Sequence, residues 1–312
     1  MIATVTLNPS LDEWVTLPYL SIGQLHRASS FERYPGGKGI NVSRVIHELG
    51  GRTVAFALAG GEDGVILRQL MNRLSIVHNF VTVNGMTRNN YKIRTKSPRA
   101  LTELNAPGPK VSARDLRELL QRLLRTRPQI DCVVFSGSLP PGAPYTVYAQ
   151  WIRKIKRRGI ITVLDASGEA LRYGLSARPW FIKPNKQEAE ELLGRSLNSR
   201  VELVRAVREL LTLGCEVVVL SLGSGGALMS ARACDDVWFA APPRVRVDSA
   251  VGAGDSFVGG FLMGWSARHS LLEAFRLGMA CGAASAMTSG TKLCHRADVR
   301  RLIRRVALQR IA

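Results

Sequence analysis

Two spacings of apolar residues alternate along this chain, and each spacing predicts a different kind of element. Short, nearly continuous apolar runs are typical of strands that are buried on both faces of a sheet. They occupy residues 2–7, 54–58, 131–136, 160–165, 180–182 and 216–221. Apolar residues that recur every three or four positions are typical of one face of a helix. They occupy residues 38–49, 63–74, 112–126, 144–157, 186–193, 200–212, 254–267, 271–288 and 296–308.

Strands that alternate with helices predict a parallel sheet between two layers of helices. Three segments depart from this pattern: a hairpin is expected at 226–241, and 11–35 and 88–104 have the alternation of short strands in an exposed sheet. No repeat or linker divides the chain, so we expect a single domain over 1–312. Segments 11–35 and 88–104 would form a flap near the sheet edge where ligands bind.

The composition is that of a globular protein, because 46% of 312 residues are hydrophobic and can form a sizeable core. No apolar run approaches the roughly 18 residues of a membrane span, and the first residues lack the pattern of a secretory signal. We therefore expect a cytoplasmic protein with no membrane partner. The five cysteines form no CxxC pair and give no sign of disulfides or zinc.

The net charge of +19, from 43 Lys and Arg against 24 Asp and Glu, raises the question of nucleic acid as a partner. The basic residues lie between apolar positions at helical spacing, as on the solvated faces of helices at 112–126 and 296–308. They are not interleaved with aromatic residues, and no nucleic-acid-binding signature is present. We expect no specific nucleic-acid partner, and a surface that attracts anionic metabolites.

The strongest local motif is VGAGDSF at 251–257, between a strand-like run and an apolar helix. Gly252, Ala253 and Gly254 let backbone N–H groups converge at a helix N-terminus, where the dipole favours an anion. Asp255, beside this anion hole, is placed to accept a proton from an alcohol that attacks a phosphoryl group. A tight turn with Asp255 complementing the helix dipole would explain the same residues.

A second glycine turn, YPGGKGINV at 34–42, also opens a helix. Gly36 and Gly37 let a ligand approach the backbone, while Lys38 and Asn41 offer a cation and an amide. The spacer and the GK[ST] ending of a Walker A loop are missing. A glycine turn without function remains the alternative interpretation.

A third motif, KPNKQE at 183–188, follows a short strand. Asn185 can cap the next helix with Glu188 at its N3 position, which is a purely structural interpretation. In a functional interpretation, Asn185 and Glu188 organise Mg²⁺ through its water ligands, and Lys183 meets nucleotide phosphates.

The glycine-rich turn SLGSGGA at 221–227 ends a strand and can lie along a nucleotide without side chains in the way. Arg88, in the proposed flap, can bind a second anion, although isolated surface cations are usually only solvated. Each motif has a plain structural explanation. Their common position at strand ends nevertheless predicts that they converge on one edge of the sheet.

In combination, these motifs resemble the ribokinase-like (PfkB) family of carbohydrate kinases, and specifically its phosphofructokinase branch. The resemblance spans the chain, through TLNPSLD at 6–12, GGKGINVSR at 36–44, TRNNYKI at 87–93, LTELNAPGP at 101–109, SGSLPPG at 136–142, DASGEAL at 165–171, KPNKQE at 183–188, SLGSGGA at 221–227, VGAGDSF at 251–257 and GTKLC at 290–294. It implies a three-layer α/β/α sandwich with a mostly parallel central sheet and a small β-sheet lid. It also implies ATP with Mg²⁺, a phosphosugar substrate, and a homodimer formed through the lids.

The resemblance also assigns roles to individual residues. Asp255 would be the catalytic base beside the anion hole at 252–254. The positions that match the sugar-binding residues are Asp12, Gly36, Gly37, Lys38, Asn41 and Ser138. Arg88 matches the arginine that binds the phosphate already on the sugar, and Arg27 is expected to reach a neighbouring subunit's sugar phosphate. The nucleotide positions match Lys183, Asn185, Ser221, Gly223 and Gly226, and Mg²⁺ would be held through water by Glu188 and Asn185.

The signature for the substrate is mixed. GTKLC at 290–294 resembles the minor bacterial 6-phosphofructokinase, whereas Lys38 and LTELNAPGP at 101–109 resemble 1-phosphofructokinase and tagatose-6-phosphate kinase. We expect transfer of the ATP γ-phosphate to the free primary hydroxyl of a fructose phosphate, with fructose 6-phosphate ahead of the other two substrates. More distant alternatives are a kinase of an unphosphorylated sugar or nucleoside, and a non-catalytic protein that binds nucleotide or nucleic acid.

Overall fold

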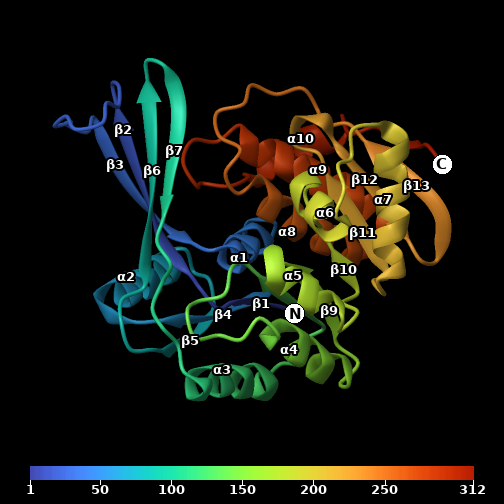
Figure 1. Ribbon diagram of the computed structural model, residues 1–312, viewed down its shortest axis with the longest axis horizontal. Coiled ribbons are helices and arrows are strands. Elements are labelled where there is room, and N and C mark those ends of the chain that lie inside the picture. The colour runs from blue at the N-terminus through green and yellow to red at the C-terminus, as the bar shows by residue number, and fades with distance from the viewer.

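The predicted alternation of strands and helices is present in the computed structural model, which describes residues 1–312 except the side chain of residue 235 (Figure 1). The large sheet contains β1 (Ile2–Thr6), β4 (Thr53–Ala59), β5 (His78–Thr82), β8 (Cys132–Ser136), β9 (Ile161–Asp165), β10 (Phe181–Ile182), β11 (Val217–Ser221), β12 (Ala227–Ala231), β13 (Cys234–Ala240) and β14 (Leu308–Arg310). The helices are α1 (Lys38–Glu48), α2 (Gly61–Arg73), α3 (Ala113–Arg125), α4 (Val147–Lys156), α5 (Gly168–Leu175), α6 (Lys186–Leu193), α7 (Arg200–Thr212), α8 (Ala253–Arg268), α9 (Leu271–Ala286) and α10 (Arg296–Ile303).

The order of the strands in the large sheet is β14-β13-β12-β11-β10-β9-β8-β1-β4-β5. From β5 to β11 the pairing is parallel, and β12, β13 and β14 extend the sheet antiparallel. The chain leaves β1 toward β4 and β5 and later returns to place β8 on the other side of β1. Ligands of such sheets bind beyond the carboxyl ends of the strands at this reversal, here just after Thr6 and Ser136.

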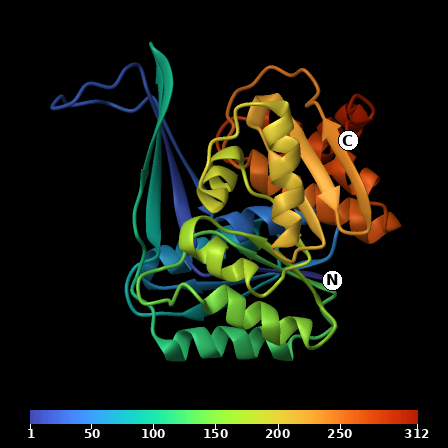
Figure 2. The same ribbon diagram turned by 45° about the vertical axis from the view of Figure 1, so that its right-hand side comes forward.

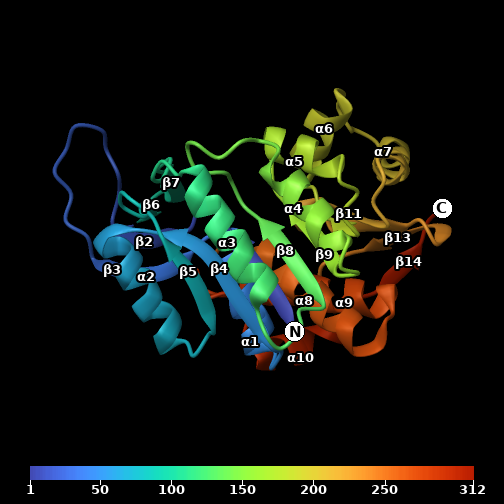
Figure 3. The ribbon, with the colours of Figure 1, turned by 90° about the horizontal axis from the view of Figure 1, so that it is seen from below.

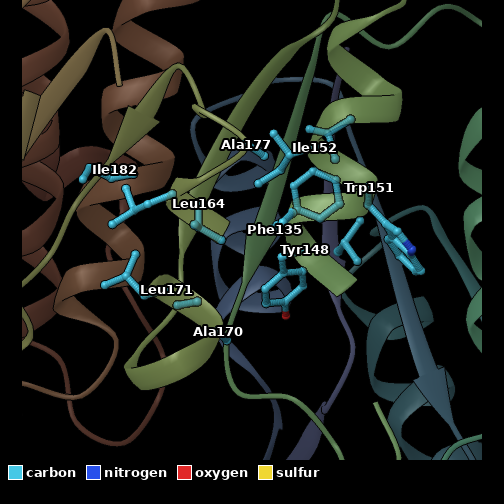
Figure 4. Close-up of a cluster of buried hydrophobic side chains, with 14 of the residues drawn as sticks. Phe135, Tyr148, Trp151, Ile152, Leu164, Ala170, Leu171, Ala177 and Ile182 are labelled. Carbon is cyan, nitrogen blue, oxygen red and sulfur yellow. The ribbon is translucent and has the colours of Figure 1, made fainter. Parts of the chain in front are cut away.

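Helices cover both faces of the large sheet, which makes three layers (Figure 3). Apolar residues of α3, α4, α5 and α7 form one core with one face of the sheet, and those of α1, α8, α9 and α10 form a second core with the other face. In the first core, Tyr148 and Trp151 of α4 lie beside Phe135 of β8 (Figure 4). The buried Tyr148 hydroxyl donates to the carbonyl oxygen of Ser136 at 3.2 Å, so the core also fixes the end of a strand that leads into the site.

The strands predicted within 11–35 and 88–104 form a separate sheet, which we call the small sheet. It contains β2 (Ser10–Leu17), β3 (Ser30–Gly36), β6 (Arg88–Lys96) and β7 (Arg99–Asn105), in the order β3-β2-β6-β7. Figures 1 and 2 show it standing beside the large sheet, with the connection between β2 and β3 projecting away from the body. On its inner face, the indole N–H of Trp14 donates to the hydroxyl of Thr291 at 2.7 Å.

Three elements differ from the sequence-based prediction. The helix expected over 296–308 ends at Ile303, and Leu308–Arg310 pairs with β13 as a strand. β5 and α5 were not predicted, because both are short and have weak periodicity.

In the described chain, no helix combines the length and the apolar character that crossing a bilayer requires.

Candidate active site

Asp255 lies in the first turn of α8, directly after the glycine-containing bend. Gly252 has a left-handed backbone with φ of 78°, and a Cβ added there would lie 2.4 Å from Cδ2 of Leu293. Both facts require glycine at this position. The N–H of Ala253 donates to the carbonyl oxygen of Ala250 at 3.2 Å and is therefore engaged within the bend, unlike in the predicted anion hole. The bend still points the N-terminus of a 16-residue helix at the space beside Asp255, where an anion is favoured.

The Asp255 carboxylate is almost fully buried and is held by Asn41 of α1, whose Nδ2 donates to Oδ2 at 2.8 Å. Burial raises the pKa of Asp255 to about 6, and the charge of Asp165 acts in the same direction, against the opposing effects of Lys38, the Asn41 hydrogen bond and Lys183. At pH 7 the carboxylate is therefore mostly ionised. A base with a pKa close to the working pH is well matched to accept a proton.

Asp165, the last residue of β9, holds two ammonium groups beside this carboxylate. Its Oδ1 lies 3.4 Å from Nζ of Lys38 and 3.8 Å from Nζ of Lys183. Burial by itself would raise the pKa of Asp165, but Lys183 and Lys38 outweigh burial and lower that pKa below its usual value. A Cβ added to Gly254 would lie 3.3 Å from Nζ of Lys183, so this ammonium group lies directly against the bend. Two cations thus flank the α8 N-terminus, as a site for a multiply charged anion requires.

Asp12 of β2 lies directly against the turn at Gly36. A Cβ added to Gly36 would lie 2.4 Å from Oδ1 of Asp12, so only glycine permits this close approach. Ser10 Oγ donates to Oδ1 of Asp12 at 3.0 Å, and Thr291 Oγ1 donates to Oδ2 at 3.4 Å. The buried carboxylate therefore has a fixed orientation and spare acceptor capacity, which suits the recognition of sugar hydroxyls.

Arg88, at the start of β6, lines a cavity of about 570 Å³ together with Asn8 and Ser138. Its Nη1 donates to the carbonyl oxygen of Ala106 at 2.9 Å, and its Nη2 donates to the carbonyl oxygen of Asn8 at 3.0 Å. The buried Nε of Arg88 has no hydrogen-bond partner among the described residues. Burial lowers the pKa of Arg88 and the charge of Asp12 opposes that effect. No carboxylate lies within ion-pair distance of Arg88 in the described part of the chain, which leaves its charge available to an anionic ligand.

Asn185 and Glu188 form a capping box at the start of α6, as the structural interpretation of KPNKQE predicted. The Glu188 N–H donates to Oδ1 of Asn185 at 2.8 Å, and the Asn185 N–H donates to Oε2 of Glu188 at 2.9 Å. Asn185 also pairs with Ser221, which brings the glycine-rich turn next to this helix end. The turn at Gly223 is exposed, whereas Gly226 has φ of 97° and lies against the carbonyl oxygen of Ala240.

The described residues contain no group of three or more His, Cys, Asp or Glu side chains that could hold a metal ion. The pKa of Lys38 is raised, against the effect of burial, by the charges of Asp165 and Asp255 and then of Glu188, so the Glu188 carboxylate lies within electrostatic reach of Lys38.

The structure thus brings together the predicted residues of four separate motifs, but one predicted residue lies elsewhere. Arg27 is exposed on the connection between β2 and β3, which projects from the body (Figure 2), and its role stays a prediction. Four residues at the site were missed: Asn8, Arg44, Asp165 and Thr291. Asp165 carried a signal, because it places a charged side chain at the end of a buried strand in a parallel sheet.

Comparisons with known proteins bear on this site. The model of the pfkB family carbohydrate kinases matches residues 6–298. The 1-phosphofructokinase of Bacillus subtilis (strain 168) is 37% identical over 288 residues, which are 92% of this chain and 93% of that protein. The ATP-dependent 6-phosphofructokinase isozyme 2 of Mycobacterium tuberculosis (strain ATCC 25618 / H37Rv) is 34% identical over 301 residues, 96% of this chain and 88% of that protein. The crystal structure of phosphofructokinase-2 from Escherichia coli in complex with substrates and products has a TM-score of 0.92 at 33% identity and covers 97% of this chain and 98% of that one.

Proposed function

The chain belongs to the pfkB family of carbohydrate kinases, and from this premise we propose that it transfers the γ-phosphate of ATP to the free primary hydroxyl of fructose 6-phosphate. The observation that carries the proposal is the buried Asp255 carboxylate, whose pKa of about 6 suits a general base, beside a helix N-terminus and two ammonium groups. This arrangement supplies both things that phosphoryl transfer needs: a proton acceptor and stabilisation of phosphate charge.

In the proposed step, the acceptor hydroxyl gives its proton to Asp255 while its oxygen forms a bond to the γ-phosphorus. The bond between that phosphorus and the β,γ-bridging oxygen breaks, and ADP leaves. Lys183 and Lys38, held by Asp165, neutralise charge on the phosphate oxygens, and the N-terminus of α8 adds backbone donors. The phosphate already on the sugar binds Arg88, and Asp12 accepts hydrogen bonds from the sugar hydroxyls.

The nucleotide would lie along the exposed turn at Gly223, between Ser221 and the start of α6. Asn185 and Glu188 would hold Mg²⁺ through its waters, and the ion would supply neutralisation of phosphate charge when bound. Their capping box is compatible with this role, because each side chain uses only one of its polar atoms in the cap.

The loop at 290–294 supports fructose 6-phosphate, because this loop resembles 6-phosphofructokinases and contacts the proposed sugar site through Thr291 and Asp12. Fructose 1-phosphate is a second candidate. Lys38, which resembles the residue of 1-phosphofructokinases, has its ammonium group 3.4 Å from Oδ1 of Asp165 beside Asp255, and the 37%-identical relative carries that name.

A substrate panel tests the proposal. ADP release is measured with fructose 6-phosphate, fructose 1-phosphate, tagatose 6-phosphate and unphosphorylated fructose at fixed ATP, with Mg²⁺ and with EDTA. We expect the highest kcat/KM with fructose 6-phosphate, and activity only with Mg²⁺. A preference for fructose 1-phosphate would transfer the assignment to the second candidate, and flat traces with all the phosphorylated sugars would refute both.

We also propose that two copies of the chain associate through their small sheets. The outer face of this sheet carries an apolar group that is partly or largely exposed: Val15, Phe31, Tyr91, Ile93 and Leu104. Exposed apolar clusters of this kind are typical of interfaces. We expect a dimer in sedimentation velocity, and dissociation on Tyr91→Glu. A wild-type monomer at micromolar concentration would contradict the proposal.

A further inference from the structure

The guanidinium of Arg44, on α1, is buried. Nη1 donates to the carbonyl oxygen of Pro35 at 3.2 Å and to Oδ1 of Asn41 at 3.1 Å, and Nη2 donates to the carbonyl oxygen of Thr291 at 2.6 Å. Within the described chain, no carboxylate lies within ion-pair distance of this guanidinium. Burial lowers the pKa of Arg44 to about 10, against the opposing charges of Asp12 and other nearby groups, so Arg44 stays charged at neutral pH. Burying a cation that only neutral acceptors hold costs free energy, so the burial of Arg44 suggests a function beyond packing.

The contact with Asn41 fixes which way the Asn41 amide faces. A guanidinium has donors and no acceptor, so it attracts Oδ1 of Asn41 and repels its NH₂ group. Nδ2 is thereby turned toward Asp255, where it donates to Oδ2 at 2.8 Å. The flipped amide would place an oxygen against the carboxylate and an NH₂ group against the guanidinium, and both contacts would be repulsive. Arg44 therefore determines whether Asp255 receives its hydrogen bond.

The other two contacts of Arg44 connect this pair to the sugar side of the cleft. Pro35 directly precedes Gly36, the residue that lies against Asp12. Thr291 donates its hydroxyl to Asp12 and accepts from Trp14 of the small sheet. The guanidinium of Arg44 thus donates hydrogen bonds to the end of β3, the first turn of α1 and the loop at 290–294.

We propose that Arg44 is a positioning residue for phosphoryl transfer, which acts through the Asn41 amide to hold the Asp255 carboxylate toward the acceptor hydroxyl. The proposal rests on the proposed function of Asp255 and adds a residue that has no direct contact with that carboxylate. The charged groups that act on Asp255 are Asp165, Lys38 and Lys183, none of which changes in the variants below, and the Arg44 guanidinium, whose direct attraction Arg44→Lys retains.

The test compares the pH dependence of kcat in Arg44→Met, Asn41→Ala and the double variant. Loss of a hydrogen bond to a charged group favours the protonated form of Asp255, so the acidic limb of the profile should move upward by about one pH unit in each single variant. At pH 7, the smaller ionised fraction of Asp255 alone should lower kcat about twofold, and misorientation of the carboxylate should lower it further. The double variant should shift by less than the sum of the two single shifts, because both changes remove the same hydrogen bond to Asp255. Arg44→Lys, which keeps a donor and the charge, should lie between wild type and Arg44→Met.

Arg122→Met is the matched control, because Arg122 also donates to an asparagine Oδ1, that of Asn79, and to a carbonyl, that of Phe80, both at 3.1 Å. This residue lies on α3, away from the cleft, and its loss should leave the pH profile unchanged. A folded Arg44→Met enzyme with the wild-type limb, or single shifts that add in the double variant, would overturn the proposal. If Arg44 had only a structural role, Arg44→Met would lower the melting temperature and leave the acidic limb of the pH profile in place.

Two further measurements keep the proposal testable if a variant or the assay fails. If Arg44→Met does not fold, Asn41→Ala must still move the limb, and an unchanged limb refutes the proposal. If the wild-type protein turns over no sugar phosphate, the proposed function fails separately. The titration of Asp255, followed by ¹³C-carboxyl NMR and identified by its loss in Asp255→Asn, should then still shift upward in Arg44→Met, and an unshifted titration would refute the link to Arg44.

Discussion

Replacing Asp255 with asparagine is expected to lower kcat by about two to four orders of magnitude, as loss of a general base does. In the wild-type protein, Nδ2 of Asn41 donates to Oδ2 of Asp255 at 2.8 Å. Asparagine has nearly the same shape as aspartate and keeps an oxygen that can accept this hydrogen bond. The KM values for ATP and the sugar phosphate should therefore change little. Steady-state ADP release measures this result, and wild-type turnover in the variant would show that Asp255 is not the base.

The same substitution should stabilise the protein, which controls for misfolding. The pKa of Asp255 is raised by folding to about 6, so the folded state binds the proton more tightly than the unfolded state does. The ionised carboxylate therefore lowers stability above about pH 6, and this effect disappears as the pH falls toward 4. Asp255→Asn should raise the melting temperature at pH 8 by a few degrees, with a smaller difference at pH 5. An inactive variant with a lower melting temperature would not support a role in catalysis.

Replacing Arg88 with alanine should raise the KM for the phosphorylated sugar by about two to three orders of magnitude. Charge-assisted hydrogen bonds contribute roughly 1.5–3 kcal/mol each, and a guanidinium can make two to a phosphate. Arg88 is preorganised for this contact, because carbonyl oxygens at 2.9 and 3.0 Å hold its Nη atoms beside the cavity. The measurement is KM for fructose 6-phosphate and for fructose 1-phosphate at saturating ATP.

Arg88→Lys is the informative companion of this variant, since it keeps the charge but loses the fork of two donors. We expect an intermediate KM. Weak activity on unphosphorylated fructose should be the same in all three proteins. If KM for the sugar phosphates stayed at the wild-type value in Arg88→Ala, the enzyme would not use Arg88 for the phosphate, and a kinase of unphosphorylated sugars or nucleosides would regain support.

The sequence predicted the layers of the fold because the elements that build them have strong local signals. The apolar runs of β4 and β8 and the helical spacing of α3 each specify their element with little help from the rest of the chain. The predicted end of the last helix, at residue 308, was wrong because the local signal there is weak. Apolar residues continue past Ile303, and only the edge of β13 decides that Leu308–Arg310 joins the sheet.

In the site, single motifs were predictable but the contacts between them were not. Asn41 was expected to face the sugar, and the structure also shows it bonded to Asp255, which is 214 positions away in the chain. Arg44 lies one turn after Asn41, yet nothing local distinguishes it from the many arginines on helix surfaces. Its burial follows from the loop at 290–294 that closes over it. Such long-range contacts need the folded chain.

The most direct test of the central claim, that Asp255 is the proton acceptor, is the pH dependence of kcat at saturating ATP and sugar phosphate. Because the protonated carboxylate cannot accept the hydroxyl proton, kcat should fall as the pH drops through about 6 and then decrease about tenfold per pH unit. The residual activity of Asp255→Asn should lack this limb. A wild-type kcat that stays constant from pH 8 to pH 5, in an enzyme that remains folded, would contradict the account.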